Sequence, residues 1–276
     1  MKQKAYGFSI VELVIILTVI SGIVLAGMVV FNKKNPVNNS AGSTTNSSQT
    51  SKQTKNSTID VNNPPKLLEA QVFELGNFKN ISKFRSGVGH DFSHGTGESC
   101  RSMKHYFNPI INTITNEASI PKTVEPGDGI AVNSPVGGDI TKLESEQFPL
   151  GKQIYIVPEE YPDFTIRLFH IYPLSNISAG TKVKAGQRIG TLLKTQGTDI
   201  AVEVSANNKY NLISYFDIMP DSLFADFEKH GVADRKDLVI TKADRDAKPL
   251  SCQGQQFSSG AEGSDSDYVP LMGYKP

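Results

Sequence analysis

The sequence has no excess of charge of either sign. It contains 28 Lys and Arg residues against 28 Asp and Glu residues, so its formal net charge is zero. Nucleic-acid-binding proteins usually present a broad surface of positive electrostatic potential, and the equal numbers of basic and acidic residues give no support for one. The sequence also lacks a nucleophile elbow, a phosphate-binding glycine loop and a dinucleotide-binding fingerprint. We therefore expect no nucleic-acid partner and none of these three chemistries.

Cysteine is scarce, because it occurs only at Cys100 and Cys252. An even pair in an exported domain can form a disulfide that joins distant parts of the chain. The alternative is two unrelated buried thiols. We predict the disulfide and, with it, a domain outside the cytoplasm.

One long apolar run stands at residues 8–31, and its single charged residue is Glu12. The run is long enough to span a membrane and does not end in a small-residue cleavage site, which favours an uncleaved anchor over a signal peptide. A carboxylate in hydrocarbon costs about 2.5–3.5 kcal/mol, so Glu12 is expected to have a partner. We predict a transmembrane helix over residues 8–31.

The segment Gly7–Leu13 reads GFSIVEL and follows a short basic leader, residues 1–7. This arrangement resembles the N-terminus of type IV prepilins. The resemblance implies cleavage by a prepilin peptidase after Gly7 and methylation of the new N-terminal residue, Phe8. It also implies that Glu12 pairs with the N-terminal amine of a neighbouring pilin-like subunit.

Residues 32–66 are rich in Asn, Ser, Thr and Lys and contain almost no apolar residues. Such a segment cannot bury enough surface to offset its ordering entropy, so it predicts a flexible linker. Pilins in general continue the anchor helix into the globular head, and this linker departs from that pattern. Lys33 and Lys34 directly after the apolar run would favour the opposite membrane orientation, and the cysteine pair leads us to prefer export.

The pattern of the remaining chain predicts a mainly β fold with some α-helix. Apolar residues alternate in several stretches of residues 67–205, for example at Phe164, Ile166, Leu168 and His170, as half-buried antiparallel strands require. Residues 206–276 are predicted to form a helical extension and a Gly- and Ser-rich tail. Helical spacing of apolar residues places one or two helices within Tyr215–Gly231.

Four segments of this region occur in a recognisable order, and they read SPVGGDITKL, FHIYPL, ISAGTKVKAGQRIG and TDIAVEV. The order resembles the β-sheet core of lysostaphin-like, LytM-type zinc peptidases, over roughly Ser82 to Ser205. The resemblance implies a β domain with a zinc-hydrolase site. Such a site needs three protein ligands and an open position for water.

The resemblance assigns a role to each site position. Asp91 stands at the position of the aspartate ligand, and His170 at that of a histidine that assists catalysis. Gly87 and Ala201 stand where the other two zinc ligands belong. Asp199 takes the place of a second catalytic histidine. Two of the three ligands are therefore missing, which predicts a remnant of a zinc site.

From this we expect a non-catalytic domain without a cofactor, which binds cell-wall peptidoglycan or parts of a pilus or secretion apparatus. His170, Asp91 and Arg101 would be polar contacts in its cleft. The other expected partners are a membrane, prepilin peptidase and pilin-like subunits. The expected localisation is a membrane anchor with the C-terminal domain outside the cytoplasm.

Two alternatives stay open. The first is an active zinc endopeptidase of cell-wall peptides with relocated ligands, in which His90 and Asp91 bind the metal and His170 is catalytic. The second is a minor pilin or pseudopilin. The stretch from His90 to His105 is dense in polar groups, but we favour a loop over a rebuilt metal site there. In this loop His94 and Glu98 are solvated and Cys100 is disulfide-bonded to Cys252, while Arg101, Lys104 and His105 pack against the core or bind an anion.

Overall fold

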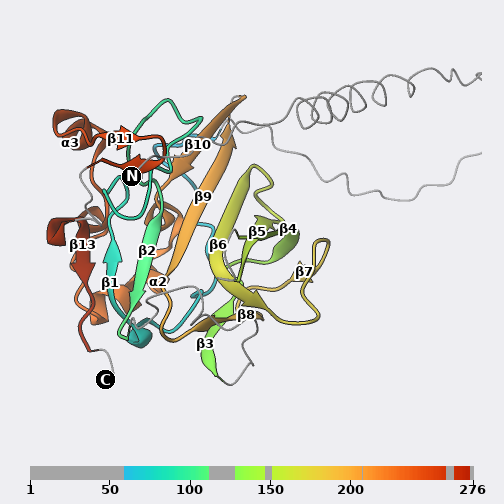
Figure 1. Cartoon of the computed structure of the whole chain (residues 1–276). Helices are drawn as coiled ribbons and strands as arrows, with labels where there is room; N and C mark the ends of the chain where they lie inside the picture. Colours follow the sequence, from blue (N-terminus) through green and yellow to red (C-terminus); the bar gives the residue numbers. More distant parts are fainter. Residues whose placement is uncertain (1–58, 112–127, 147–150, 207, 259–263, 274–276) are drawn as a thin grey trace, which may run out of the picture. The chain divides into compact units, whose positions relative to one another are not determined.

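The computed structural model describes residues 59–111, 128–146, 151–206, 208–258 and 264–273 (Figure 1). The predicted leader, transmembrane helix and most of the linker lie outside these residues. No helix in the described ranges is long and apolar enough to cross a membrane. All described residues belong to one compact unit, Asn56–Pro276. Ile59 and Val61 already pack against its core, so the fold includes residues ahead of Leu67.

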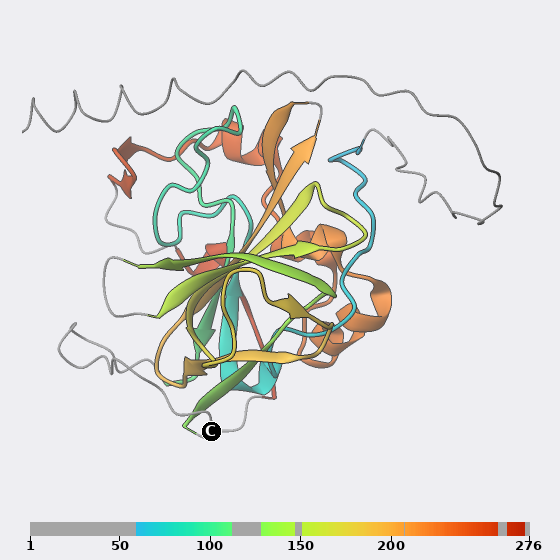
Figure 2. The ribbon, with the colours of Figure 1, turned by 90° about the vertical axis from the view of Figure 1, so that its right-hand side faces the viewer.

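An 11-stranded antiparallel sheet forms the centre of this unit. Its main path runs β13-β1-β2-β9-β6-β5-β4-β7, while β10 pairs with β9, and β8 pairs with β3 and β6. Figure 1 shows β1, β2, β9 and β6 side by side, and Figure 2 shows the strands fanning out as in a twisted sheet. The strands are β1 (Phe78–Ser82), β2 (His105–Pro109), β3 (Gly129–Asn133), β4 (Gly138–Ser145), β5 (Lys152–Pro158), β6 (Phe164–Pro173), β7 (Lys182–Val183), β8 (Arg188–Leu193), β9 (Thr198–Ala206), β10 (Lys209–Ile213) and β13 (Tyr268–Pro270).

The predicted alternation holds along most of β6 and then breaks. Phe164, Ile166 and Leu168 are buried as expected, but His170 does not continue on their face. Ile154 of β5 pairs with Leu168, whereas Lys152 pairs with Ile171, so two residues of β6 stand opposite one of β5. This β-bulge turns His170 away from the core, and His170 has a positive φ of 63°.

The predicted helical tract contains two short helices, η3 (Tyr215–Ile218) and α2 (Asp221–Lys229). Ser214 caps η3, because its side chain accepts a hydrogen bond from the backbone N–H of Phe216. α2 buries Phe224 and Phe227 and is followed by Gly231 at a φ of +91°, a conformation that glycine adopts freely. The other short elements are η1 (Leu75–Asn77), η4 (Arg235–Leu238), α3 (Lys242–Ala247), β11 (Cys252–Gln253), β12 (Gln256–Phe257) and η5 (Asp265–Asp267).

Strands from both sides of the predicted boundary at residue 206 share the sheet, because β10 pairs with β9 and β13 with β1. The main core joins the sheet to η3 and α2. A second, smaller apolar cluster contains the buried residues Phe84, Met103, Phe169, Ala201 and Leu212. This second cluster holds Ala201, one of the two positions at which a zinc ligand is missing.

Candidate functional site

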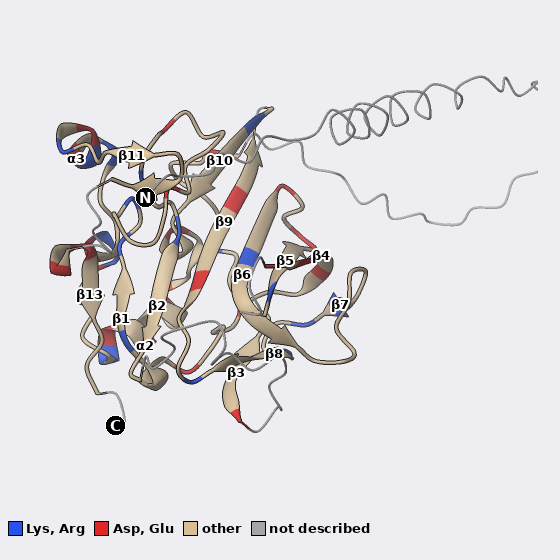
Figure 3. Ribbon diagram, in the orientation of Figure 1, with Lys and Arg blue, Asp and Glu red and all other residues tan. Residues whose placement is uncertain are grey.

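A network of charged side chains crosses the sheet at the bulge of β6. His170 comes from β6, Asp199 from the adjacent β9, and Lys104 directly precedes β2, which is the next strand. Figure 3 shows acidic residues on β9; the basic residue that it shows on β6 is Arg167, which pairs with Glu203 and is not part of this network. Strand pairing therefore brings the three residues together, although Lys104 and Asp199 are 95 positions apart in the sequence. In this pairing Tyr106 of β2 stands opposite Asp199.

Asp199 is the centre of the network and is completely buried. One carboxylate oxygen forms an ion pair with the ammonium group of Lys104, and the other lies 3.1 Å from Nε2 of His170. Burial alone would raise the pKa of Asp199, but Lys104 and His170 outweigh it and hold this pKa well below its usual range. Asp199 is therefore a carboxylate at neutral pH.

His170 lies between two carboxylates. Its Nδ1 is 2.6 Å from an oxygen of Glu146, while its Nε2 faces Asp199. Burial alone would lower the pKa of His170, but Asp199 and Glu146 outweigh it and raise the pKa to about 9. The ring is protonated at neutral pH and donates from both nitrogens, so it offers no lone pair to a metal.

We expect the stability of the domain to fall as the pH rises from about 6.5, the ordinary histidine pKa, to 9. The folded-state pKa of His170 is about 9, above the unfolded value. Its contribution is therefore complete below the unfolded pKa and is lost as the pH passes the folded one. The free energy of unfolding should decrease by about 2–3 kcal/mol across this window.

Chemical denaturation across the pH range would measure this loss, and NMR titration would assign it to His170. The variant His170→Gln should show a flatter pH dependence. His105 is an internal reference, since burial lowers its pKa to about 4. A His170 ring that titrates near its ordinary pKa would contradict the network.

Lys104 is only 3% exposed and lies among aromatic rings. Its Nζ is 4.3 Å from the ring centre of Phe169, 4.7 Å from that of Phe92 and 4.9 Å from that of Tyr106. Burial alone would lower the pKa of Lys104, but Asp199 outweighs it and raises this pKa. Lys104 is thus a buried ammonium ion that is paired with one carboxylate and surrounded by π-faces.

His90 and Asp91 have different partners. Nδ1 of His90 donates a hydrogen bond to the backbone oxygen of Asp91 at 3.0 Å, and its Nε2 is 3.3 Å from Nζ of Lys104. One carboxylate oxygen of Asp91 instead accepts hydrogen bonds from the backbone N–H and hydroxyl of Ser93 and from the backbone N–H of Arg101. The structure therefore does not join the two as the predicted metal pair: Asp91 stabilises a turn, while only His90 reaches the network.

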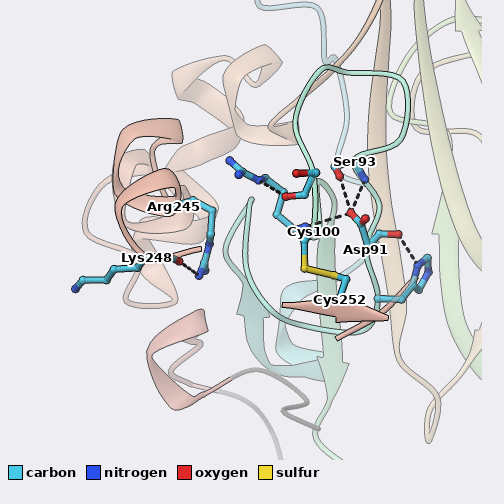
Figure 4. Close-up of a disulfide and its surroundings, with 9 residues drawn as sticks. Asp91, Ser93, Cys100, Arg245, Lys248 and Cys252 are labelled. Atoms are coloured by element: carbon cyan, nitrogen blue, oxygen red, sulfur yellow. Dashed lines mark hydrogen bonds between the residues drawn. A yellow bond between two sulfur atoms is a disulfide. The ribbon is translucent and has the colours of Figure 1, made fainter. Parts of the chain in front are cut away.

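The predicted disulfide between Cys100 and Cys252 is present (Figure 4). It ties the loop that carries Asp91 and Ser93 to β11, and the backbone N–H of Asp91 also donates to the carbonyl of Gln255 at 2.7 Å. The disulfide thus supports the loop on which His90 stands.

Arg101 was predicted to be a polar contact in the cleft, and the structure gives it another role. Its guanidinium pairs with Glu98 and with Asp246 at 2.8 Å each, and its side chain is 7% exposed. Glu98 also accepts from Arg85. Arg101 therefore connects the loop to α3 and has little surface left for a ligand.

Gly87 and Ala201, which stand where the resemblance expects zinc ligands, are both packed closely against other residues. A Cβ atom at Gly87 would lie 3.3 Å from Leu250 and 3.4 Å from Asp267, so the C-terminal segment fills the space there. Ala201 is 1% exposed within the second apolar cluster. In the described ranges, no group of three or more His, Cys, Asp and Glu side chains is arranged to hold a metal ion. The residues present do not fit the zinc site that the resemblance implies.

Sequence reasoning missed the roles of two residues. Lys104 was expected only to pack or to bind an anion, and Glu146 was not considered. Neither has a local signal in the sequence. Only the pairing of β2 with β9, which sets Tyr106 opposite Asp199, could have indicated that Lys104 meets a carboxylate.

A pocket of about 410 Å³ lies next to the network and shares Phe92 with it. The ring of Phe92 contacts Phe169 and lies under the ammonium group of Lys104. The guanidinium of Arg167 stacks on Tyr155 at 4.5 Å. The residues that line the pocket include Asp91, Phe92, His94, Arg167, Tyr210 and Leu212. The pocket combines aromatic walls with a few polar groups, as small-ligand and peptide sites often do.

No protein-family model and no curated protein sequence matches the chain. The solved structures that resemble it include lysostaphin-type peptidase domains. The catalytic domain of the antimicrobial peptidase lysostaphin from Staphylococcus simulans is 18% identical, with 52% of this chain and 95% of that chain covered and a TM-score of 0.33. In the solution structure of lysostaphin, the match covers 52% of this chain and only 51% of that chain, at 18% identity and a TM-score of 0.32.

Two other structures show likenesses of similar extent. The SpoIIQ–SpoIIIAH pore-forming complex is 14% identical, with 58% of this chain and 96% of that chain covered and a TM-score of 0.36. Csd3 of Helicobacter pylori is 14% identical, with 77% of this chain and 50% of that chain covered and a TM-score of 0.32. At these values the likenesses are partial, and the function of this chain does not follow from them.

Proposed function

We propose that this chain is a membrane-tethered protein whose β domain lies outside the cytoplasm and binds cell-wall peptidoglycan without cleaving it. The observation that carries the proposal is the buried Lys104–Asp199–His170 network. Asp199 and His170 stand where the resemblance places two histidines that assist catalysis, and such histidines must be free to exchange protons. Here the carboxylate is paired with an ammonium group and the histidine is protonated, while Gly87 and Ala201 stand at two of the three ligand positions. These elements support a site for binding and not for hydrolysis.

The pocket beside the network is the proposed binding site for the peptide part of peptidoglycan. Tyr210 and Phe92 offer flat apolar surface, and His94 is exposed at its edge. Arg167 lines the same pocket and is held in place by Glu203 and Gln153. Aromatic walls and a rigid cation suit a short peptide that carries both aliphatic side chains and carboxylates.

The tether and the location rest on the sequence and on the disulfide. Disulfides persist mainly outside the cytoplasm, and Cys100–Cys252 is consistent with export. The apolar run at residues 8–31 supplies the anchor, and the segment after Gly7 supports processing by a prepilin peptidase. Mass spectrometry of the mature chain should find a methylated Phe8 at its N-terminus; a retained leader would contradict this part.

Sedimentation with insoluble peptidoglycan tests the binding. We expect the purified chain to sediment with peptidoglycan and to release no soluble peptides from it. Tyr210→Ala should weaken binding about tenfold or more, because aromatic residues at the centre of an interface carry much of its energy. Tyr161→Ala is the matched control, since Tyr161 lines a separate pocket with Pro158 and Glu159.

Each outcome decides one part of the proposal. Release of soluble peptides by the parent chain would favour the active endopeptidase, and failure to sediment would reject peptidoglycan as the ligand. Equal losses of peptidoglycan affinity in Tyr210→Ala and Tyr161→Ala would reject this pocket as the binding site.

A further inference from the structure

The pocket beside the network carries one acidic and one basic residue in its described lining. Asp91 and Phe92 line it from the loop that the disulfide holds, Arg167 from β6, and Tyr210 from β10. Asp91 is the acidic residue and Arg167 the basic one. The pocket therefore presents a carboxylate and a guanidinium, with aromatic rings beside them, to whatever binds in its volume of about 410 Å³.

Asp91 has one carboxylate oxygen to spare. Its Oδ1 accepts hydrogen bonds from the backbone N–H and hydroxyl of Ser93 and from the backbone N–H of Arg101. No donor among the described residues is bonded to its Oδ2. Asp91 is only half-buried and lines the pocket, so this oxygen can accept from a ligand. An ammonium group has three donors and a charge of the right sign for it.

Arg167 is fixed in place and still has donors to offer. Its Nη1 donates to Glu203 and its Nη2 to Gln153. The carbon of the guanidinium lies 4.5 Å from the ring centre of Tyr155 and 5.3 Å from that of Phe92. Each terminal nitrogen carries a second hydrogen, and a guanidinium that is held in one orientation binds a carboxylate with little loss of entropy. Arg167 therefore suits a carboxylate of the ligand.

The two charges also select against ligands that carry only one kind of charge. Asp91 repels a ligand whose only charged groups are carboxylates, and Arg167 repels one whose only charged groups are amines. Such repulsion is a common source of specificity. A ligand with an ammonium group and a carboxylate satisfies both residues, while the rings of Phe92 and Tyr210 offer apolar surface to its carbon chain and π-faces to its cation.

We propose that this pocket binds the free end of a diaminodicarboxylic acid, with the ammonium group at Asp91 and the carboxylate at Arg167. The inference rests on the proposed function and names the part of the cell-wall peptide that is recognised. Where such an amino acid cross-links two peptides, its second amine has become an amide and carries no charge. The chain therefore prefers peptides that are not cross-linked.

Three small molecules with matched carbon chains test this directly. Meso-diaminopimelic acid has an ammonium group and a carboxylate at each end, pimelic acid lacks the amines, and cadaverine lacks the carboxylates. In calorimetric titrations of the purified chain, we expect meso-diaminopimelic acid to bind about tenfold or more tightly than either of the others. Equal affinity for meso-diaminopimelic acid and pimelic acid, or no binding of any of the three, would overturn the proposal.

The variant Asp91→Asn assigns the ammonium site. Asparagine keeps an oxygen that can accept from Ser93 and Arg101, so the turn is retained while the charge is lost. Its affinity for meso-diaminopimelic acid should fall about tenfold, and its affinity for pimelic acid should rise, because the repulsion is gone. A purely structural role of Asp91 would lower both affinities, and that result would contradict the proposal. Asp139→Asn is the matched control, since Asp139 pairs with Lys182 away from this pocket.

Acetylated peptidoglycan links this inference to the proposed function. Acetic anhydride converts the free amines of insoluble peptidoglycan into amides, and we expect the parent chain to bind the treated material about tenfold more weakly. Equal sedimentation with treated and untreated peptidoglycan would overturn this inference and leave the proposed function intact. Failure to sediment with untreated peptidoglycan would reject the proposed function, while preference for meso-diaminopimelic acid over pimelic acid would still support the assigned chemistry of the pocket. If Asp91→Asn does not fold, the titrations of the parent chain decide alone.

Discussion

Replacement of Asp199 by asparagine is expected to lower the free energy of unfolding by about 3–5 kcal/mol. Asp199 is completely buried and is the anionic partner of both Lys104 and His170. Its removal takes away the carboxylate that pairs with the buried ammonium group of Lys104 and leaves His170 with one carboxylate, that of Glu146. Uncompensated buried charges are among the few causes of losses this large.

Urea denaturation at neutral pH would measure the effect. Asp139→Asn is the matched control, since Asp139 pairs with Lys182 at the surface and should contribute less than about 1 kcal/mol. In a double-mutant cycle, Lys104→Met combined with Asp199→Asn should cost less than the sum of the single changes. An Asp199→Asn variant as stable as Asp139→Asn would show that the network does not carry the stability we assign to it.

Removal of the disulfide, by serine at both Cys100 and Cys252, is expected to lower the free energy of unfolding by about 2–5 kcal/mol. The two residues are 152 positions apart, so the bond restricts a large part of the unfolded chain. It also holds the loop of His90 against β11. We therefore expect the variant to lose the interaction of His90 with Lys104 as well.

Denaturation with and without a reductant would measure this loss. The parent chain should become as unstable as the serine variant when reduced, and the variant should not respond to the reductant. Equal stability of parent and variant under oxidising conditions would contradict the prediction.

Much of the fold could be predicted from local patterns. The alternation of Phe164, Ile166 and Leu168 predicted a half-buried strand, and helical spacing predicted the helices near Phe224. Such patterns are local, because a strand has a period of two and a helix a period of 3.6. The disulfide could be predicted because only two cysteines were available to pair.

The site could be predicted only in part. The resemblance identified Gly87 and Ala201 as positions without ligands and His170 as a retained residue. The bulge that turns His170 toward Asp199 depends on the register between β5 and β6, which the alternation does not contain. The role of Lys104 depends on the pairing of β2 with β9, whose residues are far apart in the sequence.

The zinc content of the purified parent chain tests the central claim most directly. The chain should be produced with added zinc and purified without a chelator, then analysed by mass spectrometry together with its peptide-hydrolysing activity. We predict far less than one zinc per chain and no change in stability after treatment with a chelator. Stoichiometric zinc, removed by the chelator together with hydrolysis of cell-wall peptides, would contradict a site that is organised by Lys104.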